Sequence, residues 1–274
     1  MTLRDNLDEV VLVVGGSGFL GRAVVKRLVS THEVISTYHR TSSPDAVPYD
    51  FFKDDVRDLL HQFGVTTIIF TAATEKKASM NFETSAERFV RGCEDVRLVY
   101  LSSDAVFSGD KGLYTERDIP EPTTSYGRNL LHFETLLREN HSNYCVIRPS
   151  YIYGFSGGLD MRLSKTRATL QANQEMTSFE DMFKSPLGVE QVAEATITLG
   201  FSDVTGIVHV AGKRMSVFDF YARAMNALSI STNGLKRGAM PRDIGLSSDT
   251  SLTISLWQEL TGMTPLSIED TLSG

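Results

Sequence analysis

The feature that most constrains this chain is a glycine-rich turn directly after a short apolar run. The run is Val10–Val14, and Gly15, Gly18 and Gly21 follow it at a regular spacing. In dinucleotide-binding folds, glycines so spaced permit a tight turn, a close approach of pyrophosphate and close packing of a helix on a strand. The start of that helix favours an anion. The turn therefore predicts a dinucleotide site, with contacts from Gly15, Ser17, Gly18, Phe19, Leu20 and Gly21.

The first 150 residues alternate apolar runs with helix-like segments. The runs are short and rich in β-branched residues: Val10–Val14, Val34–Tyr38, Thr67–Thr71, Leu98–Ser102 and Tyr144–Arg148. Helical patterns begin near Gly18, Asp54, Asn81 and Ser125. Continuously apolar strands separated by helices indicate a parallel sheet covered on both faces, and right-handed crossovers make it doubly wound. We therefore expect an α/β Rossmann domain over residues 1–150.

After Pro149 the pattern changes. We expect a helix at Val189–Leu199, a strand at Gly206–Val210 and a helix at Val217–Leu228 with Ser216 as its N-cap. The segment before them contains glycine pairs and a polar, helix-like middle. Residues 151–274 are therefore predicted to form a smaller lobe that is interleaved with the main domain and packed beside its sheet.

Charge and composition exclude several classes of partner. The net charge is −7 with both signs mixed along the chain, so nucleic acid is an unexpected partner. No apolar run reaches the roughly 20 residues needed to span a bilayer, and the N-terminus has no apolar signal core. Cys93 and Cys145 suit a reducing, cytoplasmic compartment. The six histidines are scattered, which predicts no metal site.

The end of the second predicted strand indicates which dinucleotide is bound. An NAD site usually has a carboxylate there, which holds the ribose 2′-hydroxyl. Here Tyr38 is followed by His39 and Arg40, and an arginine suits a 2′-phosphate. Arg22, just after the glycines, is a candidate second cation. The sequence favours NADP(H), unless Arg40 is simply a solvated surface residue.

Three downstream segments carry a family resemblance. They are Ser102–Phe107, Ser125–Glu134 and Arg148–Gly154. Together they resemble extended short-chain dehydrogenase/reductases, and within them the dTDP-4-dehydrorhamnose reductase branch, whose typical motifs are Ser-Thr-Asp-x-Val-Phe and Tyr-Gly-x-x-Lys. The resemblance continues in the family's order through nearly the whole chain, at Phe183–Pro186, Gly206–Gly212 and Pro241–Asp243.

This resemblance implies a chemistry and a set of contacts. Ser103 and Tyr126 would polarise a substrate carbonyl, with the tyrosine as general acid and hydride arriving from the nicotinamide. The further cofactor contacts that it implies are His39, Arg40, Ala72, Ala73, Tyr126 and Pro149. The implied contacts of the substrate, a nucleotide sugar or similar small polar molecule, are Thr74, Val106, Phe107, Tyr153 and Arg242. The resemblance also allows a homodimer.

One position departs from the family. The lysine expected four residues after Tyr126, which lowers the pKa of the tyrosine and holds the nicotinamide ribose, is Leu130 here. Arg128, His132 and Arg148 are poorly placed to substitute. Two alternatives follow. The chain is either an NADPH-dependent reductase with an atypical proton supply, or a catalytically impaired NADP(H)-binding regulatory or scaffold subunit, a role known in this branch from the beta subunit of methionine adenosyltransferase.

Overall fold

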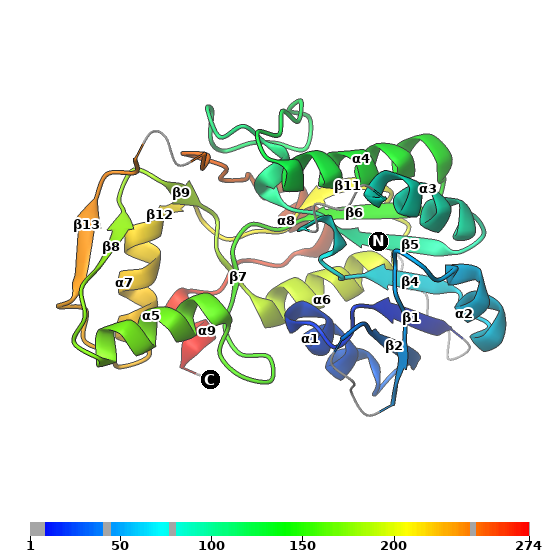
Figure 1. Ribbon diagram of the computed structural model, residues 1–274, viewed down its shortest axis with the longest axis horizontal. Coiled ribbons are helices and arrows are strands. Elements are labelled where there is room, and N and C mark those ends of the chain that lie inside the picture. The colour runs from blue at the N-terminus through cyan, green and yellow to red at the C-terminus, as the bar shows by residue number, and fades with distance from the viewer. Residues whose placement is uncertain (1–8, 41–44, 77–80, 242–244, 274) are drawn as a thin grey trace.

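A parallel sheet forms the larger part of the molecule (Figure 1). The computed structural model describes residues 9–40, 45–76, 81–241 and 245–273. Seven parallel strands lie in the order β11-β6-β5-β4-β1-β2-β3. Their bounds are β1 (Val10–Val14), β2 (Glu33–Tyr38), β3 (Ala46–Pro48), β4 (Thr67–Phe70), β5 (Arg97–Leu101), β6 (Tyr144–Arg148) and β11 (Gly206–His209). The predicted doubly wound α/β fold is confirmed, and of the seven strands of this sheet the sequence patterns missed the short edge strand β3.

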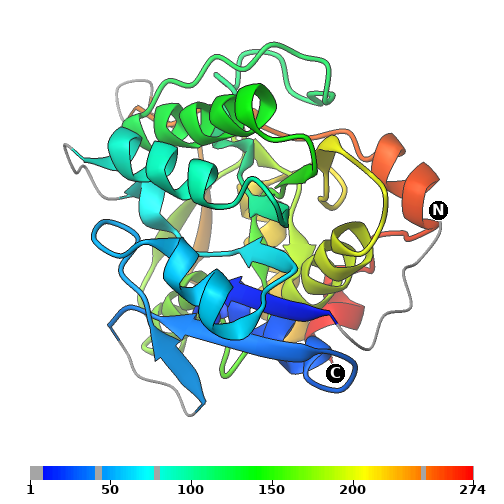
Figure 2. The same ribbon diagram turned by 90° about the vertical axis from the view of Figure 1, so that its right-hand side faces the viewer.

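Helices cover both faces of this sheet (Figures 1 and 2). On one face α1 packs against α6, and on the other α3 packs against α4 and α2. The bounds are α1 (Phe19–Leu28), α2 (Val56–Phe63), α3 (Phe82–Gly92), α4 (Ser125–Asn140) and α6 (Val189–Gly200). Alternate residues of β1 enter opposite cores: Leu12 belongs to the α3–α4 side, and Val11 and Val13 belong to the α1–α6 side. Burial on both faces explains why the strands are continuously apolar.

The core under α3 and α4 is unusually aromatic. The ring centroids of Phe70 in β4 and Phe133 in α4 are 5.4 Å apart. Tyr100 of β5 stacks on Phe133, with ring centroids 4.1 Å apart and an angle of 9° between the ring planes. Phe51 and Phe89 complete the cluster. These large rings fix the position of α4 on the sheet, because offset and edge contacts between rings constrain geometry more than aliphatic packing does.

The chain after residue 150 contributes to both parts of the molecule. Strand β11 belongs to the main sheet and helix α6 packs on it, whereas a third hydrophobic core holds the lobe together. The lobe lies to one side of the sheet (Figure 1). Its helices are α5 (Met161–Gln171), α7 (Val217–Ala227) and α9 (Ile268–Leu272), and its parallel strand pair is β8 (Met176–Phe179) with β13 (Leu235–Gly238). Ser216 caps α7 as predicted, since its Oγ accepts from the Asp219 amide at 3.0 Å.

Short elements connect the two parts. They are the pair β7 (Ile152–Tyr153) with β10 (Leu187–Gly188), the pair β9 (Phe183–Lys184) with β12 (Met215–Ser216), and helix α8 (Ser255–Thr261). Helix α8 packs on β11 and α6, so the chain near its C-terminus crosses back to the main sheet. Within the described residues, no helix is both long and apolar enough for a membrane span.

A buried ion pair joins the sheet to α4. Arg148 at the end of β6 donates to both carboxylate oxygens of Glu134, at 2.9 and 2.5 Å. The two side chains are 1% and 2% exposed. Ser102 also donates to Glu134, at 2.5 Å. A bidentate, fully buried pair positions both partners, and removing one of them leaves an uncompensated charge in the core.

We predict that Arg148→Ala lowers the free energy of unfolding by about 3–5 kcal/mol, because the Glu134 carboxylate stays buried without its partner. The matched control is Arg223→Ala, which breaks an equally short but half-exposed pair with Glu269 (2.7 Å). It should cost less than about 1 kcal/mol. Urea unfolding followed by circular dichroism measures both, and equal losses would contradict the structural role of the buried pair.

Candidate active site

Two adjoining cavities lie beyond the carboxyl ends of the sheet strands, around the point where the strand order reverses at β1. The larger has a volume of about 750 Å³ and the smaller about 140 Å³. Gly15, His39, Ala72 and Ala73 line both, so the two form one elongated site. In open α/β sheets this crevice is where ligands bind. Its volume is within the usual range for cofactor and small-molecule sites.

The glycine-rich turn forms the floor of the larger cavity. Gly15 has a φ of +84°, and a Cβ there would lie 2.7 Å from the backbone of Ala72 after β4. A Cβ on Gly21 would lie 2.2 Å from the Gly15 carbonyl oxygen. The N-cap of α1 is Gly18, which has no side chain to cap the helix, and its first turn contains no acidic residue. The amides of this turn therefore suit an anion such as a pyrophosphate.

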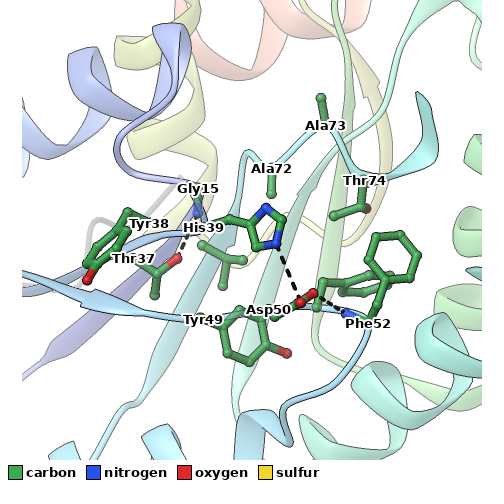
Figure 3. Close-up of a pocket in the computed structure, with 12 residues that line it drawn as sticks. Gly15, Thr37, Tyr38, His39, Tyr49, Asp50, Phe52, Ala72, Ala73 and Thr74 are labelled. Carbon is green, nitrogen blue, oxygen red and sulfur yellow. Dashed lines mark hydrogen bonds and ion pairs between the residues drawn. The ribbon is translucent and has the colours of Figure 1, made fainter. Parts of the chain in front are cut away.

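The smaller cavity is a narrow slot beside the end of β2 (Figure 3). His39 Nε2 lies 3.5 Å from Asp50 Oδ2, and Asp50 Oδ1 accepts from the Phe52 amide at 3.1 Å. Partial burial acts to raise the pKa of Asp50, but the Phe52 amide, Lys53 and His39 outweigh it and hold the pKa below its usual value. A slot with aromatic walls and one fixed carboxylate fits a planar heterocycle that carries an N–H donor.

Arg40 and Arg22 occupy different environments. Arg40 is exposed and lines the larger cavity close to the end of β2, as the NADP(H) prediction requires. Arg22 donates to the Ser17 carbonyl at 2.6 Å and to the Ser156 carbonyl at 2.9 Å. It thereby clamps the glycine turn to the loop after β7. Arg22 also lines the larger cavity, so its role as a second phosphate cation stays a prediction.

Ser103 and Tyr126 come together in the larger cavity, as predicted. Ser103 follows β5 and caps the 3₁₀ turn η2 (Asp104–Val106), and its Oγ donates to Asp104 Oδ1 at 2.9 Å. Tyr126 lies in the first turn of α4, whose N-cap Thr124 accepts from the Gly127 amide at 3.0 Å. A hydroxyl and a phenol that converge in one cavity can hydrogen-bond a carbonyl oxygen from two sides.

The electrostatics of Tyr126 differ from those of an activated tyrosine. Burial raises the pKa of its phenol most strongly, and the nearby carboxylates of Glu75 and Asp104 raise it further. A hydrogen bond with Ser103 and the charge of Arg162 oppose this only in part. The phenol is therefore protonated at neutral pH. It can donate a hydrogen bond to a ligand, but it releases its proton reluctantly.

The Leu130 side chain is 1% exposed and packs in the aromatic core with Phe133, so it places no charge in the cavity. The cations that line the larger cavity are Arg22, Arg40, Arg162 and Lys184. Arg162 is exposed, and its guanidinium carbon lies 4.1 Å from the centroid of the Tyr151 ring. Arg162 therefore faces the lobe side of the cavity.

Lys184 forms a network that the sequence reasoning missed. Its Nζ lies 2.9 Å from Asp104 Oδ2, and that oxygen also accepts from Ser150 at 2.9 Å and Thr250 at 2.6 Å. Burial acts to raise the pKa of Asp104, but Lys184 and these hydroxyl groups outweigh it and lower the pKa. Lys184 is paired with Asp104, so it does not simply take the place of the lysine that the resemblance implies at position 130. The only sequence signal was its place in the family-like segment Phe183–Pro186.

The remaining predicted contacts divide into two groups. Ala72, Ala73 and Thr74 line the smaller cavity, and Pro149 lines the larger. The substrate contacts assigned to Val106, Phe107 and Tyr153 are corrected, because these side chains are 0%, 1% and 2% exposed and lie in the hydrophobic cores. The turn η2 directs Val106 and Phe107 inward, where the rings of Phe107 and Tyr114 stack with their centroids 4.2 Å apart. Tyr151 and Ile152 line the cavity in place of Tyr153. Arg242 lies outside the described residues.

Comparison with known proteins identifies the family. A family model described as the RmlD substrate binding domain matches residues 9–273. The chain belongs to this family. It is 28% identical over 223 residues to a probable low-salt glycan biosynthesis reductase of Haloferax volcanii, covering 73% of this chain and 74% of that protein. It is 29% identical over 157 residues to methionine adenosyltransferase 2 subunit beta of Rattus norvegicus, covering 53% and 47%.

Solved structures show the same fold over nearly the whole chain. A hypothetical dTDP-4-dehydrorhamnose reductase from Sulfolobus tokodaii superposes with a TM-score of 0.82 and 26% identity, covering 96% of this chain and 98% of that one. A dTDP-4-dehydrorhamnose reductase from Bacillus anthracis, in complex with NADP, gives a TM-score of 0.83 at 20% identity, with 96% of each chain covered. The predicted extended short-chain dehydrogenase/reductase fold of this branch is confirmed.

We predict that the stability contributed by Asp104 depends on pH. Its folded-state pKa is below the ordinary value of 3.8, so its contribution is present above about pH 4 and is lost as the pH falls through the folded pKa. Asp104→Asn should therefore be less stable than the parent by about 3 kcal/mol at pH 7, with the gap narrowing at pH 3. Urea midpoints measured at both pH values check this, and a constant gap would contradict it.

Proposed function

We propose that this protein is an NADP(H)-dependent reductase of a carbonyl group on a nucleotide sugar or a similar small polar substrate. The single observation that carries the proposal is the convergence of Ser103 and Tyr126 in a cavity that also contains the glycine turn. The family supports it, because the relative in Haloferax volcanii is named a probable reductase. The NADP bound to the Bacillus anthracis relative supports the choice of cofactor.

The residues of the site fit this cofactor along its whole length. The slot beside Asp50 would take the adenine, Arg40 the 2′-phosphate, and the first turn of α1 the pyrophosphate. The cavity side nearest Tyr126 and Pro149 is left for the nicotinamide. When bound there, the cofactor supplies hydride. Gly15 packs against the Ala72 backbone with no room for a Cβ, and this close contact holds the turn before α1 beside the cavity, where the pyrophosphate would bind.

The chain's own residues then polarise the carbonyl and supply the proton. The Ser103 hydroxyl and the Tyr126 phenol would both donate to the carbonyl oxygen, and the phenol would transfer its proton as the oxygen gains charge. Asp104 holds the Ser103 hydroxyl in place and is itself held by Lys184. Because the pKa of Tyr126 is raised, we expect proton transfer to be slow compared with a site that contains the family lysine.

A second candidate function is favoured by the same raised pKa. With Leu130 buried and no cation beside the phenol on α4, the chain would bind NADP(H) but turn over poorly, as a regulatory or scaffold subunit. The similarity to methionine adenosyltransferase 2 subunit beta supports this alternative, although the alignment spans about half of each chain. A partner protein is then required, whereas the reductase needs only a small substrate.

Arg40→Ala should weaken NADPH binding by roughly tenfold or more while leaving NADH binding within about twofold, because only NADPH carries the 2′-phosphate. Fluorescence titration of the purified protein with each cofactor measures this. The control is Arg27→Ala, an exposed arginine of α1 that pairs with Glu190 outside the larger cavity. Equal losses of NADPH and NADH affinity would show that Arg40 does not bind the 2′-phosphate.

Tyr126→Phe should abolish NADPH oxidation with any keto-sugar nucleotide that the parent protein reduces, because the ring stays in place while the proton donor is lost. A spectrophotometric screen of such substrates checks both the parent and the variant. NADPH oxidation that persists in Tyr126→Phe would show that the phenol is not the proton donor. A parent protein that binds NADPH but reduces no substrate in the screen would favour the regulatory alternative.

A further inference from the structure

Arg22 bridges the two parts of the molecule. It directly follows the last glycine of the glycine-rich turn, and its Nη1 donates to the Ser17 carbonyl at 2.6 Å. Its Nε and Nη2 both donate to the Ser156 carbonyl, at 3.2 and 2.9 Å. Ser156 lies in the loop between β7 and α5, at the edge of the lobe. One planar guanidinium therefore joins the turn that would hold a pyrophosphate to a loop of the lobe.

The loop between β7 and α5 runs from Gly154 to Asp160 and is closed at its base. The Asp160 amide donates to the Gly154 carbonyl at 2.9 Å, and the Gly154 amide donates to the Asp160 carboxylate at 3.2 Å. At the tip, residues 155–158, Gly157 has a φ of +67°, and a Cβ there would lie 2.9 Å from Arg22 Nε. In the part of the chain that the structure describes, the hydrogen bonds that reach this tip from outside the loop come from Arg22 alone.

The residues on either side of this loop form the lobe-side wall of the larger cavity. Tyr151 and Ile152 precede the loop, Arg162 follows it, and all three line the cavity. Arg162 Nη2 donates to the Ile152 carbonyl at 3.2 Å, which ties the two sides of the loop together. The position of the loop therefore affects the position of this wall.

Arg22 can bind a phosphate without releasing the loop. A guanidinium has five N–H donors, and three of those in Arg22 are used by the two carbonyl groups. The other two have no partner among the described residues. The side chain is exposed and lines the larger cavity, so these two donors are accessible to a phosphate oxygen of a bound dinucleotide.

We propose that Arg22 is a positioning residue that transmits cofactor binding from the glycine turn to the lobe, so that bound NADP(H) orders the loop Gly154–Asp160. This inference rests on the proposed function, because it requires the dinucleotide phosphates to lie at the start of α1. A phosphate that fixes the guanidinium also fixes Ser156, which the same guanidinium holds, and the loop loses conformational freedom. The lobe-side wall of the cavity is then fully ordered only with the cofactor in place.

The test is hydrogen–deuterium exchange of the full chain, with and without saturating NADPH, followed by mass spectrometry. We expect NADPH to slow the exchange of peptides that cover Gly154–Asp160 by roughly fivefold or more in the parent. In Arg22→Met, which keeps the length of the side chain but has no donor, the slowing should be less than about twofold. Arg27→Met is the matched control and should respond as the parent does, because Arg27 pairs with Glu190 and does not line the larger cavity.

Gly157→Ala separates the bridge from phosphate binding. Its Cβ would push the tip of the loop away from Arg22 and leave the arginine in place. The variant should still bind NADPH in a fluorescence titration, but NADPH should no longer slow exchange in the loop. It also decides between the outcomes if Arg22→Met does not fold. Peptides from α8, which does not line the cavity, report any stabilisation of the whole molecule.

Three results would overturn the inference. A parent that binds NADPH with no more slowing in the loop than in α8 would show that the cofactor does not order the loop. Slowing that persists in Arg22→Met or in Gly157→Ala would show that the coupling does not pass through Arg22. Both results leave the proposed function intact. Absence of NADPH binding to the parent would overturn the proposed function together with this inference.

Discussion

The contact between the ends of β1 and β4 is the constraint on which the rest of the site depends. Gly15 leaves β1 with a positive φ and passes so close to Ala72 that no side chain fits between them. Gly21 lets α1 approach this turn with equal closeness. The first turn of α1 is thereby held over the point where the strand order reverses, and both cavities open around it. A larger residue at Gly15 or Gly21 would move the helix and close the anion site.

The opposite side of the site depends on buried charge. Glu134 and Arg148 attach α4 to β6, and the aromatic cluster around Phe133 fixes the height of that helix above the sheet. Tyr126 is placed by this helix, and Ser103 is placed by the turn after β5 that Asp104 and Lys184 hold. The proton donor is thus well positioned but poorly activated, because burial of the phenol, and after it the carboxylates of Glu75 and Asp104, raise the pKa of Tyr126. Both the reductase and the regulatory alternative are consistent with a Tyr126 phenol that is well positioned but not activated.

The sequence predicts the local features well and the long-range ones poorly. Strands and helices of the sheet lie within a few residues of their expected bounds, because continuous apolar runs and glycine spacing are local signals. The ion pair of Lys184 with Asp104 joins positions 80 residues apart, and no spacing rule reveals it. The resemblance implies substrate contacts at Val106 and Phe107, yet η2 turns both side chains into the core. Glu75 likewise has no local signal of burial, because two lysines follow it in the sequence, while Tyr100 and Asn129 hold it inside.

We propose that one elongated site holds NADP(H), with the adenine beside Asp50 and the nicotinamide beside Tyr126. The most direct test is a crystal structure of the chain grown with NADPH. We expect pyrophosphate oxygens on the amides at the start of α1, the 2′-phosphate near Arg40 and the nicotinamide within reach of Ser103 and Tyr126. Crystals grown in saturating NADPH that show the cofactor elsewhere, or show this site without it, would contradict this placement.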